Sequence, residues 1–235
     1  MDNEIENEVN IKLLKNMLEL QDKLNTKTCG DKWTLGITTE GREINWKRYM
    51  RMELFELIDS SDKFKHWKNL DGGVDFENIK MEVVDVWHFL MSQALTELPI
   101  NAIILMYCYS VLNDEYEAAK ELDYFGIIDM ADNMIESTYA NGEGSMNDMF
   151  YNFFKLLASV GMSFGDLYKQ YLVKNVLNAF RQNNGYKQGT YVKEINGDED
   201  NVHIMSIANN RPNITPDELY EKYQLFYNNN AGKEI

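Results

Sequence analysis

The sequence has few cysteines, few prolines and no long apolar run, and each shortage excludes a class of protein. Two cysteines among 235 residues do not suit a disulfide-rich secreted scaffold and are typical of a reduced, cytoplasmic protein. Three prolines leave long segments free to form helices. No stretch of about 18 apolar residues predicts a membrane span. We therefore expect a cytoplasmic protein without a membrane partner.

Basic residues are also scarce, and this bears on partners. The formal net charge is −15, with 38 acidic and 23 basic residues. Because nucleic acids and anionic membranes are bound through clustered Lys and Arg, this balance argues against either as the main partner. A local basic cluster can still bind a small anionic ligand. A hydrophobic content of 44% supports a folded globule of one domain, with or without a small insertion.

Apolar residues recur at spacings of three and four along most of the chain, which predicts a nearly all-α fold. Polar segments at 26–43, 60–73 and 185–201 are expected to be non-helical, and 139–148 is the best internal linker. Thr215-Pro216-Asp217-Glu218 is a capping box that predicts a short final helix. The predicted helices are 10–24, about 44–59, one opening at Asp75, two within 101–139, 149–160 and 163–183.

Two pairs of acidic residues lie one turn apart on consecutive predicted helices. Glu53 and Glu56 form the first pair, and Glu82 and Asp85 form the second, within an apolar run that predicts burial nearly all round. Ionised carboxylates in an apolar setting are costly unless they are paired or bind a metal. Hard oxygen donors suit Mg²⁺, or Mn²⁺ as its substitute, rather than zinc.

Other interpretations of the acid pairs remain open. A single pair at this spacing is often a solvated helix face. A di-iron bundle also places acids on paired helices, but it expects Glu-x-x-His units, whereas His88 follows Asp85 and no second such His exists. A connection as long as 60–73 allows the two helices to pack as an antiparallel pair, so that their acids face each other. We expect a helical bundle whose paired helices bind a metal.

A second cluster combines basic and amide side chains in the C-terminal third of the sequence. The parallel N–H donors of Arg and the positive charge of Lys both bind phosphate oxygens, and a metal held by the acids would bind the same phosphates. The alternative is a solvated basic face. The residues of this cluster are Tyr171, Lys174, Asn178 and Arg181 on one predicted helix, then Lys187 and Lys193, with Asp200-Asn201 closing the segment.

Amides extend the apolar stripe of the first predicted helix. Gln21 and Asn25 each offer a donor and an acceptor, as the edge of a pyrimidine base requires, although the helix can instead simply emerge into solvent there. Trp67, in the connection between the acid-bearing helices, is either a packed residue or an aromatic wall against a base or sugar.

Several motifs in this order resemble the all-α dimeric dUTPases of certain bacteria, phages and trypanosomatids. They cover most of the chain apart from about residues 97–147. The segments that carry the resemblance are Leu20–Asn25, Met52–Ser60, Lys65–Lys68, Glu82–Phe89, Lys174–Lys187 and Glu199–Asn201.

The resemblance implies one all-α domain over residues 1–235, with a variable helical insertion at about 97–147. It also implies a homodimer that hydrolyses dUTP, and dUDP, to dUMP, which limits uracil in DNA and supplies the precursor of dTMP. The implied Mg²⁺ ligands are Glu53, Glu56, Glu82 and Asp85, with Asn201 close to the metal and phosphates. A water attacks the β-phosphorus, and Glu56 is favoured over Glu53 as its base.

The remaining implied roles concern the phosphates and the base. Gln21 and Asn25 would recognise uracil, with Trp67 nearby. Two alternatives stay open: a related all-α pyrophosphohydrolase that acts on dCTP or several nucleoside triphosphates, and a non-catalytic regulatory protein that binds a partner. The implied phosphate ligands are Lys174, Asn178, Arg181, Lys187 and Lys193.

Overall fold

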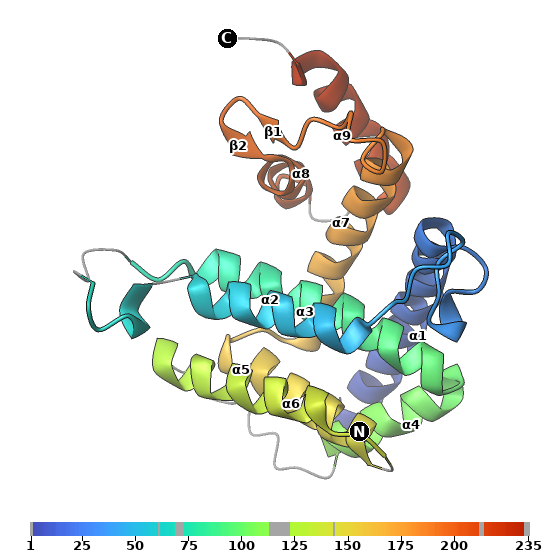
Figure 1. The fold of residues 1–235 in the computed structure, drawn as a ribbon, viewed down its shortest axis with the longest axis vertical. Coiled ribbons are helices and arrows are strands. Elements are labelled where there is room, and N and C mark those ends of the chain that lie inside the picture. The colour runs from blue at the N-terminus through green and yellow to red at the C-terminus, as the bar shows by residue number, and fades with distance from the viewer. Residues whose placement is uncertain are drawn as a thin grey trace. The chain divides into compact units, whose positions relative to one another are not determined.

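The computed structural model describes residues 2–60, 62–68, 73–112, 123–142, 144–211 and 214–232. Within them the chain is almost entirely helical, which confirms the all-α fold predicted from the sequence (Figure 1). The elements are α1 (Asp2–Cys29), η1 (Trp33–Leu35), α2 (Trp46–Asp59), η2 (Asp62–Phe64), α3 (Phe76–Glu97), α4 (Ile100–Leu112), α5 (Tyr124–Tyr139), α6 (Ser145–Ser159), α7 (Phe164–Asn183), β1 (Glu194–Ile195), β2 (Asp198–Glu199), α8 (Asp200–Asn209) and α9 (Pro216–Asn230).

The chain divides into two compact units. The first unit is Met1–Tyr168 and the second unit is Lys169–Ile235, so the boundary falls within α7. The prediction that residues 1–235 form one domain stays a prediction. Of the predicted insertion at 97–147, residues 113–122 and 143 lie outside the described residues, and α4 and α5 occupy most of the rest.

Helices α2 and α3 form an antiparallel pair in the first unit (Figure 1). Asn78, early in α3, donates to the Ser60 hydroxyl just beyond α2 at 3.0 Å. At the other end Trp46, which begins α2, stacks on Phe89 with ring centroids 6.1 Å apart. The carboxylate of Asp75 caps α3 by accepting the backbone N–H of Asn78 at 2.9 Å, as a helix N-terminus requires. The predicted pairing of these helices is confirmed.

The core of the first unit centres on the indole of Trp87, which α3 turns toward α6. Phe153 stacks on it at 4.8 Å, and Phe150 and Phe154 pack around it at 6.0 and 5.9 Å between ring centroids. Each buried ring contributes a large apolar area, so this cluster fixes α3 against α6. Helix α5 joins the same body, because the Tyr124 hydroxyl donates to the backbone carbonyl of Ile58 at the end of α2.

Several helix boundaries differ from the prediction, and α6 begins at Ser145, inside the linker predicted at 139–148, rather than at 149. Helix α1 runs from Asp2 to Cys29 rather than from 10 to 24, since its first turns are polar and gave no apolar stripe to follow. Its last turn continues until Gly30, whose φ of 94° ends the helix. Helix α2 begins at Trp46, because the Asn45 side chain accepts the backbone N–H of Arg48 at 2.9 Å.

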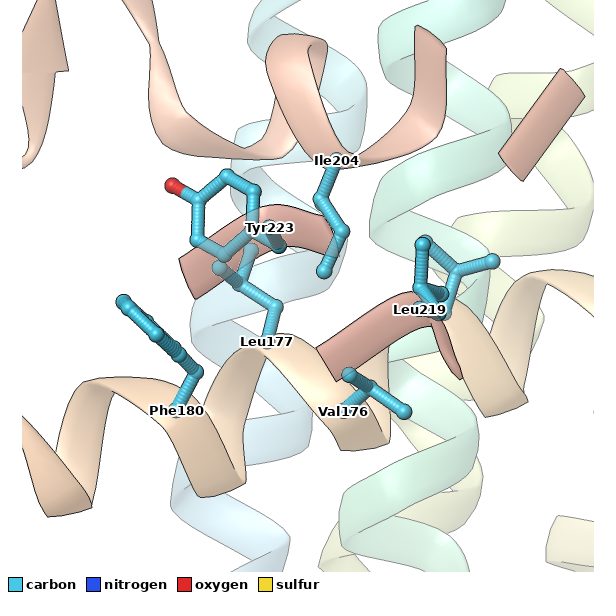
Figure 2. Packing of buried hydrophobic residues seen from close by; sticks show 7 residues of the cluster. Val176, Leu177, Phe180, Ile204, Leu219 and Tyr223 are labelled. Carbon is cyan, nitrogen blue, oxygen red and sulfur yellow. The ribbon is translucent and has the colours of Figure 1, made fainter. Parts of the chain in front are cut away.

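The second unit is built on the apolar face of α7, against which α8 and α9 pack (Figure 2). The predicted capping box at the start of α9 is confirmed, because the Thr215 hydroxyl and the Glu218 carboxylate each bond to the other residue's backbone N–H. The buried residues of this core are Val173, Val176, Leu177, Phe180, Ile204, Leu219 and Tyr223.

A hairpin and a further helix replace the end of the loop expected at 185–201. Strands β1 and β2 pair antiparallel around Asn196 and Gly197, whose φ values of 55° and 88° make the tight two-residue turn that Asn-Gly favours. Helix α8 then begins at Asp200, so the expectation that this segment is non-helical through Asn201 is wrong. With 10 residues and an acidic first turn, α8 offers little periodicity to detect.

We predict that Phe180→Ala destabilises the second unit by about 3–5 kcal/mol, the usual cost of removing a buried aromatic ring. Phe180 is fully buried, and its ring centroid lies 4.8–5.3 Å from those of Tyr220, Tyr223 and Tyr227. Urea unfolding followed by far-UV circular dichroism measures the loss. Leu225→Ala, at an exposed site on α9, serves as the control and should cost less than about 0.5 kcal/mol. Equal costs for the two variants would contradict this core.

Candidate functional site

Three carboxylates converge where α2 and α3 face each other. Glu53 comes from α2, Glu82 and Asp85 come from α3, and one ligand oxygen from each lies within 4.8 Å of the other two. Glu82 is buried, and Glu53 and Asp85 are half-buried. The structure therefore brings together three of the four acids predicted to bind a metal.

The packing of α2 explains why Glu53 joins this cluster and Glu56 lies at its edge. Met50, Leu54 and Leu57 are buried along one stripe of α2. Glu53 follows Met50 by three residues and precedes Leu57 by four, so it lies along the same inward side. Glu56 is exposed, yet its negative charge still acts on Glu53.

Burial, together with the negative charges of Asp85, Glu82 and Glu56, raises the pKa of Glu53 from 4.5 to about 8. Like charges at this separation disfavour one another's ionised form, so without a cation Glu53 holds a proton at neutral pH. A divalent cation reverses that balance, because it favours the ionised carboxylates. Three convergent carboxylate oxygens with no sulfur donor are the ligands that Mg²⁺ and Mn²⁺ prefer, so the residues fit such an ion.

A buried amide network lies on α1 and α3. Gln21 Nε2 donates to Asn25 Oδ1 and to Ser92 Oγ, both at 3.0 Å, and Asn25 Nδ2 donates to Ser92 Oγ at 2.9 Å. His88 Nδ1 lies 2.7 Å from Gln21 Oε1. Gln21 and Asn25 are each 3% exposed, so the alternative that α1 simply emerges into solvent there is wrong.

Sequence reasoning missed two members of this network. Ser92 and His88 lie four residues apart on the buried side of α3, and the Ser92 hydroxyl donates to the backbone carbonyl of His88 at 2.7 Å. Polar residues at helical spacing inside an apolar run were the available signal. Their partners on α1 are 67 to 71 positions away, which no local pattern reveals.

The indole of Trp67 is 69% exposed, so it is not a packed interior residue. Its ring meets that of His66 edge-on at 5.0 Å. Residues 69–72, which follow it, lie outside the described residues. The predicted role of Trp67 against a base or sugar stays a prediction.

The predicted phosphate ligands lie in the second unit, and Arg181 is the most constrained of them. It forms an ion pair with Asp200 at 2.6 Å, and its side chain is largely buried, so the alternative of a solvated basic face is wrong for Arg181. Asn178 Oδ1 lies 3.4 Å from Arg181 Nη1. Tyr171, expected on the same polar stripe, is instead fully buried.

The other basic residues are more accessible. Lys193 pairs with Glu199 at 3.1 Å, and both side chains are about half exposed. Lys174 is half-buried on α7 and Lys187 is exposed. Asn201, predicted to lie near the metal and phosphates, is half-buried in the first turn of α8.

The family model for dUTPase matches residues 13–186 of this chain. The chain belongs to the dUTPase family. It is therefore a dUTP diphosphatase, a hydrolase that acts on a phosphoanhydride bond of a nucleotide, and the resemblance to the all-α dUTPases is confirmed. No curated protein matches the chain.

The match places the acid cluster and the amide network of this dUTPase inside the family region. It includes α7 with Lys174, Asn178 and Arg181, and it ends before Lys187, Lys193 and Asn201. Across the part of the chain that the structure describes, no helix has the length and apolar character needed to span a membrane.

We predict that the metal-free protein loses stability as pH rises toward about 9. Because the pKa of Glu53 is raised from 4.5 to about 8, its protonated form stabilises the fold fully below pH 4.5, and this contribution is lost as pH rises through about 8. Glu53→Gln stays neutral and keeps the contribution. In EDTA, its melting temperature should exceed that of the wild type by several degrees at high pH, and the difference should shrink toward about pH 5.

Thermal unfolding followed by circular dichroism tests this pH dependence. Glu19→Gln, which removes an exposed acid from α1, is the matched control and should follow the wild-type curve. Parallel curves for Glu53→Gln and the wild type would contradict the raised pKa of Glu53.

Proposed function

We propose that this dUTPase is a Mg²⁺-dependent homodimer that converts dUTP, and also dUDP, to dUMP. The observation that carries the metal requirement is the convergence of Glu53, Glu82 and Asp85 within 4.8 Å of one another. Bound Mg²⁺ would lower the pKa of water and neutralise charge that develops on phosphate oxygens.

In this proposal the acids of the α2–α3 pair divide two tasks. Glu53, Glu82 and Asp85 hold the metal, because their oxygens already converge. Glu56 is exposed one turn from Glu53 and outside that trio, so it accepts the proton of the attacking water. Attack at the β-phosphorus breaks the bond to the oxygen that bridges it to the α-phosphorus. The products are dUMP and pyrophosphate from dUTP, or dUMP and phosphate from dUDP.

The basic side chains of the second unit bind the phosphates in this proposal. Arg181 supplies directed N–H donors, whereas Lys174, Lys187 and Lys193 supply point charges on flexible stems. Asn178 adds a neutral amide beside Arg181. In a chain with a net charge of −15, such a local cluster focuses anions that the rest of the surface repels.

Uracil recognition is assigned to Asn25 and Gln21. Beside its bonds to Gln21 and Ser92, the Asn25 amide has one further N–H donor and one further acceptor lone pair, which complement a carbonyl oxygen and the N3–H of uracil. Cytosine reverses that pattern, and a site built from buried amides rejects it because its own groups are then left unpaired. Exclusion of thymine requires a close wall against its 5-methyl group.

The homodimer is proposed from the family resemblance and from exposed apolar side chains. Met52 and Phe55 on α2, Leu105 on α4 and Phe125 on α5 are each more than half exposed in the first unit. Where such side chains form one contiguous patch, they mark a protein–protein interface. Sedimentation velocity measures the oligomeric state directly. The cytoplasmic location suggested by the cysteine content stays a prediction.

We predict that the purified protein, assayed with Mg²⁺, hydrolyses dUTP and dUDP at least about 100-fold faster than dCTP or dTTP, as a site that hydrogen-bonds its substrate allows. Release of dUMP, pyrophosphate and phosphate is the measurement. Preference for dCTP, or equal rates on all nucleotides, would indicate the broader pyrophosphohydrolase. No turnover with any nucleotide would indicate the regulatory, non-catalytic alternative.

We predict that Glu82→Gln abolishes Mg²⁺-dependent turnover, with a loss of about 1,000-fold or more, because it removes one of three convergent ligands while keeping the side-chain volume. Calorimetric titration with Mg²⁺ should show a matching loss of affinity, and far-UV circular dichroism should be unchanged. Glu77→Gln, at an exposed site in the first turn of the same helix, is the control. Undiminished turnover of Glu82→Gln would show that α3 does not hold the metal.

A further inference from the structure

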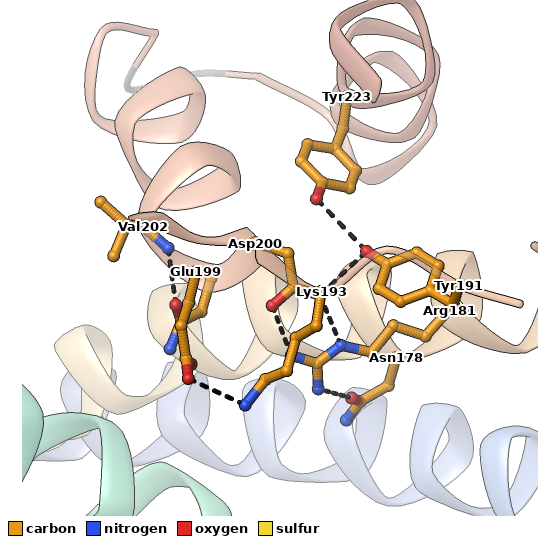
Figure 3. A network of polar contacts seen from close by, with 9 residues as sticks. Asn178, Arg181, Tyr191, Lys193, Glu199, Asp200, Val202 and Tyr223 are labelled. Carbon is orange, nitrogen blue, oxygen red and sulfur yellow. Dashed lines mark hydrogen bonds and ion pairs between the residues drawn. The ribbon is translucent and has the colours of Figure 1, made fainter. Parts of the chain in front are cut away.

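A fully buried carboxylate in the second unit accepts three hydrogen bonds. Asp200, at the start of α8, accepts from Arg181 Nε at 2.7 Å, Arg181 Nη2 at 2.6 Å and the Tyr191 hydroxyl at 2.8 Å. The Tyr191 hydroxyl in turn lies 3.3 Å from that of Tyr223 on α9. Figure 3 shows these contacts as one connected chain. The proposed function gives Asp200 no role.

Asp200 occupies only one edge of the Arg181 guanidinium. That edge carries the Nε–H and one N–H of Nη2, and Asn178 lies beside Nη1 at 3.4 Å (Figure 3). A guanidinium has five N–H donors, so one donor on each terminal nitrogen remains after these contacts, and the outer edge between Nη1 and Nη2 is not the edge that Asp200 occupies. Two parallel donors of this kind bind phosphate oxygens in a bidentate fashion. The bond to Asp200 therefore fixes the plane of Arg181 without using the edge that a phosphate needs.

The neighbouring ion pair of Lys193 and Glu199 behaves differently. Both of its side chains are about half exposed, and exposed pairs of this kind contribute little and exchange partners readily. The pair of Arg181 and Asp200 is 12% and 0% exposed, and separating it would leave a buried charge without compensation. An anion that binds nearby therefore separates Lys193 from Glu199 more easily than it separates Arg181 from Asp200.

We propose that Asp200 is a positioning residue for dUTP hydrolysis, which holds the outer edge of the Arg181 guanidinium in the orientation that meets the substrate phosphates. The inference rests on the proposed function, which assigns Arg181 to those phosphates. Asp200 acts through Arg181 and does not touch the substrate. A purely structural pair would tie α8 to α7 and would leave kcat unchanged in any variant that folds.

The test is a double-mutant cycle in the full-length protein, with kcat and KM for dUTP measured in Mg²⁺. Asp200→Asn should lower kcat about 30–100-fold, since misplacement of a catalytic contact costs up to about 100-fold. KM should stay within about threefold, because the charge of Arg181 remains to attract phosphate. Arg181→Lys keeps the charge but loses the fork, and should lower kcat similarly. The double variant should be no more than about twofold worse than the worse single one, because both changes remove the same contact.

Two further variants supply a fallback comparison and a control for this experiment. Tyr191→Phe leaves the ion pair intact and removes one hydrogen bond to Asp200, so it should lower kcat about two- to fivefold in the wild type and not at all in the Arg181→Lys background. If Asp200→Asn fails to fold by far-UV circular dichroism, this comparison decides. Glu221→Gln makes the same change of charge at an exposed site on α9 and should match the wild type.

The outcomes separate the inference from the proposed function. Losses that multiply in the double variant, or a folded Asp200→Asn with wild-type kcat, would overturn the inference and leave the proposed function intact. A rise in KM without a fall in kcat for Asp200→Asn would overturn it as well. Full activity of Arg181→Lys would show that the oriented guanidinium is not needed and would overturn the inference too, whereas a wild type without dUTP turnover in Mg²⁺ would contradict the proposed function. If Asp200→Asn does not fold, the Tyr191→Phe variant decides. The inference is then overturned if the kcat losses of Tyr191→Phe and Arg181→Lys multiply, or if Tyr191→Phe alone leaves kcat unchanged.

Discussion

Repulsion among carboxylates is the constraint on which the first unit depends. Glu53, Glu82 and Asp85 bring carboxylate oxygens within 4.8 Å of one another in a partly buried setting, and burial together with the neighbouring negative charges raises the pKa of Glu53. The α2–α3 pair tolerates this arrangement because apolar packing around Trp87 holds α3 in place. The fold thus keeps together groups that would separate in water, and a divalent cation relieves that repulsion as it binds.

Both units gather their buried polar groups into hydrogen-bonded networks, but the two networks differ in charge. In the first unit Gln21, Asn25 and Ser92 are neutral side chains that bond to one another. In the second unit Arg181 and Asp200 are ionised and fully desolvated on the carboxylate side, so the pair resists exchange. Under the proposed function, neutral amides recognise the base, and a charged group held in a fixed orientation by its ion pair binds the phosphates.

Local pattern predicted much of the fold and less of the site. The apolar period located α2 and α3, and the capping motif at Thr215–Glu218 located the start of α9, because each signal depends on residues within a turn of one another. The same logic grouped the acids, since residues three apart must share a face. It missed α8, a short helix after a two-residue turn, and the first turns of α1, which are polar. It also missed the pairing of Arg181 with Asp200, because a hairpin brings together residues 19 positions apart.

Helix α3 carries more than one part of the candidate site along a single axis. Asp85 belongs to the acid cluster, and Ser92, seven residues later, belongs to the amide network. At about 1.5 Å per residue, the two lie roughly 10 Å apart along the helix axis. A helix packed on both sides neither stretches nor shortens, so this spacing is constant. Under the proposed function, α3 therefore sets a fixed distance between the metal site and the base site. Only a nucleotide with a matching distance between its phosphates and its base can place that base against the amide network.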